Sequence, residues 1–223
     1  MDDRTFGRSA FLGTVGLGLA GLFFGRTVTD AIGRVIPDSV QAIVPTRGWR
    51  IYTIRAGLPN VDAEAFRFRI DGAVERPVDY TLADLRRLKQ ETQISDFHCV
   101  TGWTVKNVTW RGIRLEQLLA EARPTAAAKA LRFVSVEEPY DDSLTLDQAF
   151  LPDVMLALEM DGAPVKRAHG GPTRLVMPRM YGYKSVKWVG RIEVLDDVDH
   201  LGYWEQRGYD VDAWIGRSNG YSS

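Results

Sequence analysis

The stretch DFHCVTGW, residues 96–103, contains the only cysteine of the 223-residue chain, Cys99, directly after His98. Four roles are open to such a cysteine. It could be a small buried side chain, or a nucleophile with His169 as its base. It could bind zinc together with His98, His169 and His200. Finally, its thiolate could bind a metal that brings its other ligands with it, since soft metals favour sulfur.

The neighbours of Cys99 narrow these roles. Asp96, Thr101 and Gly102 are polar or turn-forming, so the thiol is expected where a strand meets a loop, which is where sites tend to be built. No local signature of a cysteine nucleophile is present. Adjacent side chains of a strand point to opposite faces, so His98 and Cys99 would seldom share one zinc ion. A thiolate on a metal with its own large anionic cofactor is favoured; the nucleophile and the zinc site stay as alternatives.

An anionic cofactor needs a phosphate-binding segment, and residues 168–188, AHGGPTRLVMPRMYGYKSVKW, have that composition. Gly170-Gly171 permits close approach of the backbone to a ligand. His169 and Arg174 offer hydrogen-bond donors, and arginine suits bidentate phosphate contact. Residues 181–187 form a second small-residue turn with two lysines. The alternative is a pair of ordinary turns with solvated lysines.

Short elements are expected to position these loops. Alternating or apolar runs predict strands at residues 50–54, 66–70, 91–97, 131–136, 154–160, 174–177 and 185–194. Short helices are predicted at residues 81–88, 115–121 and 145–148, two of them from capping patterns. Because the elements do not alternate as βαβα, we expect a mixed α+β domain rather than a doubly wound parallel sheet. Asp141-Asp142 is interpreted as a solvated turn, and the aromatic tail from Gly202 is expected to pack on the body.

Composition and the N-terminus bear on partners and location. A net charge of −1 argues against nucleic acid as the main partner. Residues 10–25 are an apolar run flanked by arginines, with the length of a signal-peptide core. The stretch RSAFLG looks like a twin-arginine export pattern with Ser9 in place of the second arginine. We therefore predict a Tat-like signal or membrane anchor at 1–26, a linker at 27–48, a folded domain at 49–223 and a periplasmic or other extracytoplasmic location.

Two segments together resemble the sulfite oxidase family of molybdopterin-dependent oxidoreductases, near its bacterial periplasmic protein-methionine-sulfoxide reductase branch. HCVTGWTVKNVTWRGIRLEQLL, residues 98–119, is similar to the family's molybdenum-cysteine segment. HGGPTRLVMPRMYGYKSVKWVGRIEVL, residues 169–195, is similar to its pterin-phosphate segment. The resemblance runs from about Trp49 to Glu193. It implies the mixed-sheet α+β fold of that family and a molybdenum–molybdopterin cofactor.

The resemblance also implies roles for individual residues. Cys99 would bind molybdenum and be the catalytic residue. The other cofactor-binding positions would be Tyr52, Thr53, Ser135, His169, Arg174, Ser185, Val186 and Lys187. The implied reaction is oxygen-atom transfer on a small substrate such as a sulfoxide or sulfite, with electrons exchanged through a separate membrane or periplasmic cytochrome.

The sequence departs from the family at the substrate side. Sulfite oxidases have an arginine shortly after the metal cysteine, and CVTGWTV has none. Upstream, only Arg55 is kept from a segment that helps to bind the oxyanion, and Arg179 and Met180 differ from the reductase branch. Substrate and direction of reaction therefore stay open. The rival functions are a catalytically silent pterin-binding or membrane-anchored binding protein and a cysteine hydrolase.

Overall fold

The computed structural model describes residues 48–221. The chain divides into two units, residues 1–50 and 51–223, and the second unit contains the helices and strands of the fold. The predicted export segment and nearly all of the predicted linker lie outside the described residues. Within residues 48–221, no helix is long and apolar enough to cross a membrane.

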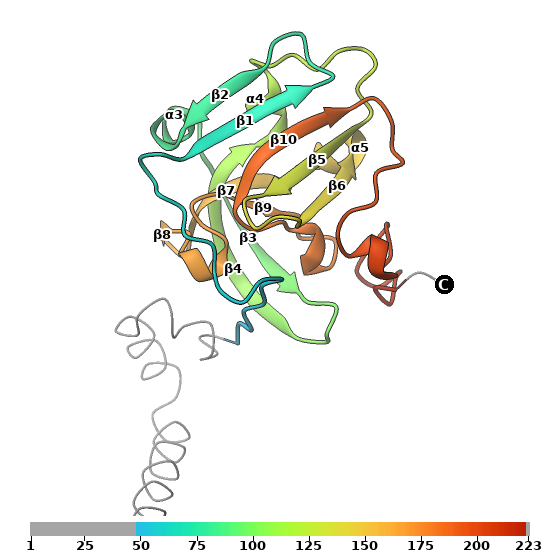
Figure 1. The fold of residues 1–223 in the computed structure, drawn as a ribbon. Helices are drawn as coiled ribbons and strands as arrows, with labels where there is room; N and C mark the ends of the chain where they lie inside the picture. The colour runs from blue at the N-terminus through green and yellow to red at the C-terminus, as the bar shows by residue number, and fades with distance from the viewer. Residues whose placement is uncertain (1–47, 222–223) are drawn as a thin grey trace, which may run out of the picture. The chain divides into compact units, whose positions relative to one another are not determined.

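Two five-stranded sheets make up the unit (Figure 1). The first runs in the order β2 (Val78–Thr81), β1 (Arg67–Gly72), β10 (Val189–Leu195), β5 (Ala130–Ser135) and β6 (Asp141–Thr145). The second runs β3 (Glu91–His98), β4 (Thr104–Arg114), β7 (Met155–Met160) and β8 (Ala163–Pro164), and β9 (Arg174–Val176) also pairs with β7.

Strand pairing is antiparallel except between β1 and β10, which run parallel with Arg69 opposite Arg191. The sheets are therefore mixed, as the irregular order of elements predicts. Two expected strands were wrong in whole or in part. Residues 50–54 form no strand, and the strand expected at 185–194 begins only at Val189. The residues before Val189 form the 3₁₀ turn η2 (Gly182–Lys184) and its exit.

Three short helices lie where the sequence predicts them. They are α3 (Leu82–Arg87), α4 (Leu115–Leu119) and α5 (Leu146–Ala149). Thr81 and Thr145 each accept a hydrogen bond from the backbone three residues later, and the side chain at that position bonds back, so both predicted capping boxes are confirmed. Two more 3₁₀ turns within residues 48–221 are η1 (Arg167–His169) and η3 (Glu205–Arg207).

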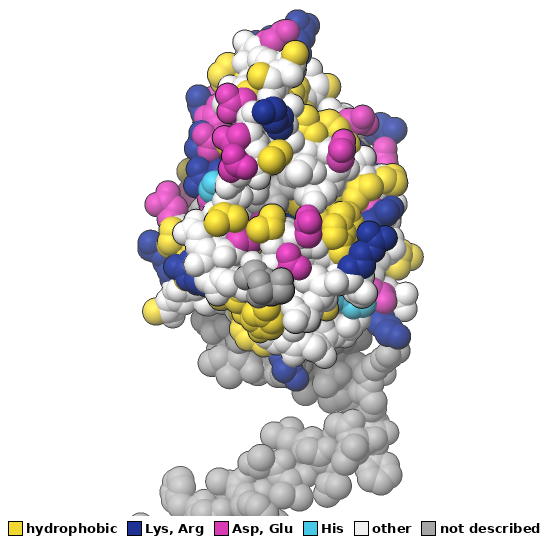
Figure 2. All heavy atoms as spheres, turned by 90° about the vertical axis from the view of Figure 1, so that its right-hand side faces the viewer, with side chains coloured by type: hydrophobic (Ala, Val, Ile, Leu, Met, Phe, Trp, Pro, Cys, Tyr) yellow, Lys and Arg dark blue, Asp and Glu magenta, His cyan; other side chains and the backbone are white. Residues whose placement is uncertain are grey.

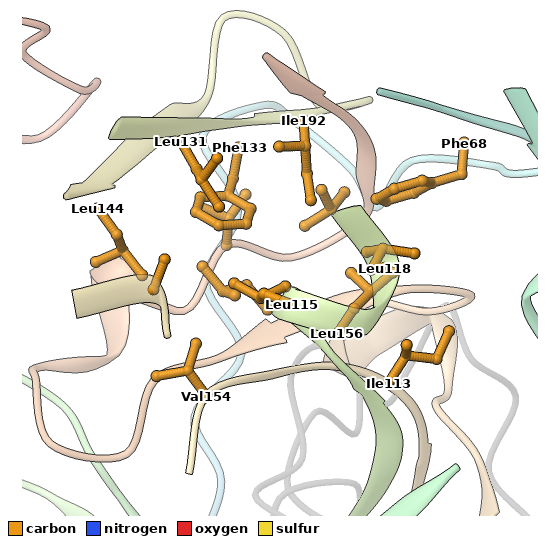
Figure 3. Packing of buried hydrophobic residues seen from close by; sticks show 14 of the residues in the cluster. Phe68, Ile113, Leu115, Leu118, Leu131, Phe133, Leu144, Val154, Leu156 and Ile192 are labelled. Atoms are coloured by element: carbon orange, nitrogen blue, oxygen red, sulfur yellow. The ribbon is translucent and has the colours of Figure 1, made fainter. Parts of the chain in front are cut away.

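The hydrophobic core joins the inner faces of the two sheets (Figure 3). Leu131, Phe133 and Ile192 come from β5 and β10 and are fully buried. They pack in one cluster with Leu115 of α4 and Leu156 of β7. Each such side chain stabilises the fold by about 1.5–3 kcal/mol on burial. The core thus holds both sheets, and the loops between them, in one arrangement.

Asp141 and Asp142 correct the prediction of a solvated turn, because both begin β6 and are buried. Asp142 Oδ1 accepts a hydrogen bond from Lys184 Nζ at 2.5 Å, and Glu205 Oε1 accepts one from the same nitrogen at 2.8 Å. Burial raises the pKa of Asp142 well above its usual range, and Lys184 opposes this only in part. The prediction failed because the partner cation lies far along the chain and cannot be seen in the local pattern.

Candidate molybdopterin site

Cys99 follows the last residue of β3, in the turn that leads to β4. Its backbone N–H donates to the carbonyl of Trp103 at 2.9 Å, and Gly102 N–H donates to the carbonyl of Cys99 at 3.0 Å. Gly102 has φ of 86°, a left-handed conformation that favours glycine. Cys99 Sγ lies 3.2 Å from Thr101 Oγ1 and the residue is partly exposed. The thiol is therefore accessible to an incoming ligand. Its partial exposure argues against the first alternative, a small buried side chain.

The three histidines lie in separate environments. His98 Nδ1 is 3.0 Å from Thr104 Oγ1 across the β3–β4 pair, and His200 Nε2 is 3.0 Å from Asp141 Oδ2. Among residues 48–221, no three His, Cys, Asp or Glu side chains are grouped so that they could hold a metal ion. The zinc alternative is therefore wrong for the part of the chain that the structure describes.

His169 is also unsuited to act as the base of a cysteine nucleophile. Burial lowers its pKa to about 3, and the positive charges of Arg174, Lys187 and Lys166 contribute to the lowering. A general base works best with a pKa near the working pH. His169 would accept a proton only at strong cost, which disfavours the hydrolase alternative.

The glycine-rich segment packs directly on Lys187. Gly170 has φ of 100°, and a Cβ at that position would lie 2.6 Å from Lys187 Cβ. Trp188 N–H donates to the carbonyl of Gly170 at 2.9 Å. The two loops that were predicted separately from the sequence are thus held together, and glycine is required for their close approach.

Arg174 connects these loops to the segment that carries Cys99. It lies on β9, is 3% exposed, and donates from Nη1 to the carbonyl of His169 at 2.8 Å. Its guanidinium also lies 4.9 Å from the ring centre of Phe97, two residues before Cys99, and 5.3 Å from that of Trp110. Burial lowers the pKa of Arg174 to about 10.

Lys187 places a second cation next to Arg174. Burial and the charge of Arg174 lower its pKa to about 7, and Glu137 opposes the change. Its Nζ donates to the carbonyl of Tyr52 and lies 4.0 Å from the ring centre of Trp188. Two neighbouring cations, of which Arg174 is buried, are a favourable setting for a multiply charged anion.

Residues 53 and 54 are joined to this part of the site by hydrogen bonds to Glu137. Ser135 Oγ accepts a hydrogen bond from Glu137 N–H at 2.9 Å. The Glu137 carboxylate accepts bonds from Thr53 Oγ1 and, at 3.0 Å, from Ile54 N–H. Burial raises the pKa of Glu137. Thr53 and Ser135, predicted as cofactor positions, therefore lie around one buried carboxylate that the sequence analysis missed, and the carbonyl of Tyr52, a third predicted position, accepts from Lys187.

Ser185 and Val186 sit in the body of the domain between the two loops. Both are buried, and Ser185 Oγ accepts a hydrogen bond from Met177 N–H at 3.0 Å. Leu175 N–H donates to the carbonyl of Val186 at 2.9 Å. In the described chain, these contacts fix the exit of η2 against β9. They leave the predicted backbone contacts of the two residues with a cofactor as a prediction.

Two aromatic residues near the thiol were also missed. Phe97 lies under Arg174 and against Trp103, with ring centres 5.6 Å apart, and a Cβ on Gly182 would overlap its ring. Tyr209, from the C-terminal segment, is near enough for the charge of Cys99 to contribute to raising its pKa, after burial and Tyr221. In the sequence, the only feature that could have pointed to Tyr209 is the aromatic composition of the tail from Gly202.

A cavity of about 450 Å³ lies beside Glu137. Its lining includes Arg55, Asn60, Asp62 and Arg67. Arg55 donates from Nε to the carbonyl of Glu138 at 2.7 Å, which fixes its guanidinium at the cavity edge. On the face drawn in Figure 2, acidic and basic side chains are interspersed and neither sign dominates.

These donors fit a metal–pterin cofactor with an anionic phosphate. One soft thiolate on an open turn suits a metal that carries further sulfur ligands. The neighbouring cations Arg174 and Lys187 suit a phosphate. Such a combination suits a domain that binds a metal–pterin cofactor through its phosphate.

Comparison with known proteins agrees: residues 55–204 match the oxidoreductase molybdopterin binding domain, and the chain belongs to this family. It is 29% identical over 198 residues to the Bacillus subtilis oxidoreductase YuiH, covering 86% of this chain and 96% of YuiH. It is 33% identical over 155 residues to the protein-methionine-sulfoxide reductase catalytic subunit MsrP of Pseudomonas syringae, covering 62% of this chain and 46% of that protein.

Among solved structures, the chain is similar to the sulfane dehydrogenase SoxCD of Paracoccus pantotrophus, with a TM-score of 0.62 and 27% identity. The match covers 66% of this chain and 42% of that one. The chain thus spans about half the length of the reductase subunit and less than half of the dehydrogenase chain. The resemblance to the sulfite oxidase family is confirmed, and with it an enzyme with a molybdopterin cofactor.

Proposed function

We propose that this chain is a molybdenum-dependent oxidoreductase that transfers an oxygen atom to or from a small sulfur compound, such as a sulfoxide or sulfite. The observation that carries the proposal is the link from the Cys99 turn to the cation pair of Arg174 and Lys187 through Phe97. It brings a soft metal ligand and a phosphate site into one unit. The relatives named as methionine-sulfoxide reductases favour a sulfoxide.

In this proposal each residue of the chain has a stated task. Cys99 binds the metal through its thiolate. Arg174 and Lys187 hold the phosphate, which would restore the proton on Lys187 by raising its pKa above the value of about 7 that it has without an anion. Glu137 forms hydrogen bonds with Thr53 and Ser135 and so fixes the position of both residues next to the cofactor. When bound, the cofactor supplies two-electron oxygen-transfer chemistry, and the protein supplies orientation and charge.

The remaining predicted contacts follow the same scheme. Tyr52, Thr53, Ser135, His169, Ser185 and Val186 would line the pterin and its phosphate. His169, kept neutral by a pKa of about 3, would act as a neutral hydrogen-bonding group. His98 forms a hydrogen bond with Thr104 and would stabilise the Cys99 turn without binding the metal itself.

Partners and location belong to the same proposal. Residues 1–26 would act as an export signal or anchor, residues 27–48 as a linker, and residues 49–223 as the catalytic domain outside the cytoplasm. Electrons would be exchanged with a separate membrane or periplasmic cytochrome. The relatives that support an extracytoplasmic location are the reductase subunits.

The test is metal and pterin analysis of the full chain purified from a host that makes the cofactor, followed by assays with sulfoxides and sulfite and an artificial electron carrier. We expect molybdenum and pterin in equal amounts and turnover of at least one sulfur compound. Stoichiometric cofactor with no turnover would favour the silent pterin-binding protein. Absence of both metal and pterin would contradict the proposed function.

A further inference from the structure

The C-terminal segment returns to the turn that carries Cys99. Gly220 lies against Val100, the residue after Cys99, so closely that a Cβ on Gly220 would overlap the valine side chain. Gly220 also has φ of 89°, which favours glycine there. The close approach places Gly220 on the turn that carries Cys99.

This returning segment is fixed to the cofactor-side loop. Tyr181 donates from its hydroxyl to the carbonyl of Ser218 at 3.2 Å, and Ser218 Oγ accepts from Gly220 N–H at 2.8 Å. Tyr183, buried next to Lys184, donates from its hydroxyl to the carbonyl of Asp210 at 2.6 Å. The segment is therefore held by the same loop that leads to Ser185 and Lys187.

Tyr221 pairs with Tyr209 at the end of this return. The two residues form an antiparallel bridge, and their ring centres are 5.0 Å apart. Asp210 N–H donates to the carbonyl of Gly220 at 3.2 Å, which strengthens the pairing. Tyr209 packs in addition on Tyr183, at 5.2 Å between ring centres. Tyr221 is half exposed, so its ring covers Tyr209 from the solvent side.

We propose that Tyr221 is a positioning residue: by packing on Tyr209 it holds Gly220 against Val100, and this returning segment with its two rings forms one wall of the approach to the thiol. The functional meaning of this wall rests on the proposed function, because it would then contact the substrate and orient it on its path to the metal. The geometry itself depends only on the contacts of Gly220, Val100 and the two tyrosines.

The only cysteine of the chain provides a direct probe of the wall. The full chain, produced without cofactor, is treated with iodoacetamide, and the rate of Cys99 alkylation is followed by mass spectrometry. We expect Tyr221→Ala and Gly220→Val to raise this rate roughly tenfold, because each releases the wall locally. Tyr221→Phe, which keeps the ring, should stay near the wild-type rate. Val211→Ala is the matched control, since Val211 is an exposed apolar residue of the same segment.

The thermal midpoint of each variant is measured alongside, and alkylation is followed at a temperature well below the midpoint of every variant, so that global unfolding does not contribute to the rate. Wild-type alkylation rates in both Tyr221→Ala and Gly220→Val would overturn the proposal. An equal rise in Val211→Ala, or in Tyr221→Phe, would also overturn it, because the effect would then not come from the ring.

In the cofactor-loaded protein, Tyr221→Ala should raise KM several-fold with unchanged molybdenum content. An unchanged KM would contradict the role in substrate approach. A chain that binds no molybdenum, but in which the alkylation rates change as expected, would refute the proposed function and leave the wall in place.

Discussion

The turn of Cys99 and the loops of Arg174 and Lys187 differ in how they are held. Cys99 is partly exposed and is fixed by backbone hydrogen bonds within its own turn. Arg174 is 3% exposed and contacts residues of η1, β3 and β4. The two regions therefore differ in structure. The Cys99 turn, where a reaction would occur, is partly exposed and is held by contacts within the turn. The Arg174 region, which would hold the charge of the cofactor, is part of the buried core.

The sharpest way to break this comparison is Cys99→Ser. We expect loss of activity greater than the roughly 10–100-fold that removal of an outer partner of a metal site costs. Stability should change by no more than about 0.5 kcal/mol, because the side chain is partly exposed. Molybdenum analysis, turnover and urea unfolding measure the two effects. Full activity in Cys99→Ser would refute the role of the thiolate.

The buried side should respond in the opposite way, as Lys184→Ala can show. Lys184 is 1% exposed and is the ammonium shared by Asp142 and Glu205. Its removal leaves two buried carboxyls without their cation, so we expect a loss of about 3–5 kcal/mol in the free energy of unfolding.

Arg111→Ala is the control for Lys184→Ala. Arg111 pairs with Glu159 at an exposed position and should cost no more than about 1 kcal/mol. If the two variants unfold at similar urea concentrations, the buried triad does not stabilise the domain.

The stability of the buried region should depend on pH because of Lys187. Its pKa is about 7 in the folded chain without an anion and 10.5 in its ordinary state. Between these values the unfolded chain binds more protons, so the stability of the cofactor-free protein should rise with pH in this window. Lys187→Met should flatten that rise, as urea unfolding at several pH values would show.

Lys106→Met, at an exposed position of β4, should keep the pH dependence of the wild type. Addition of inorganic phosphate should also flatten the rise, because an anion next to Lys187 favours its charged form. A pH dependence that is the same in wild type and Lys187→Met would contradict the lowered pKa.

The smallest effect is expected at Thr101, whose hydroxyl lies 3.2 Å from Cys99 Sγ. Thr101→Val should change the alkylation rate of the cofactor-free protein by only a few-fold, because one neutral hydrogen bond contributes about 0.5–1.5 kcal/mol. A change as large as that expected for Tyr221→Ala would mean that the turn, and not the aromatic wall, controls access.

Local patterns predicted the parts of this molecule that depend on near neighbours. The capping boxes at Thr81 and Thr145 and the mixed character of the sheets were confirmed. The family and its cofactor were read correctly from two segments of sequence.

Long-range contacts were not predictable in this way. Asp142 and Lys184 lie 42 positions apart, so the sequence gives no local sign that they pair. Glu137 gathers Thr53 and Ser135 only in the folded chain. The expected strand at residues 50–54 failed because a short apolar alternation does not by itself supply a pairing partner, and strand formation depends on that context.

The parallel pair of β1 and β10 constrains how the domain is made. Arg69 of β1 pairs with Arg191 of β10. The first sheet therefore cannot form completely until nearly all of the unit has been synthesised. Pairing over such a distance makes folding slow, because a long loop must close before the contact forms. The cations proposed to hold the cofactor, at residues 174 and 187, lie just before β10. Assembly of the site should therefore coincide with the end of synthesis, and a ribosome-bound chain that stops before residue 189 should bind no pterin.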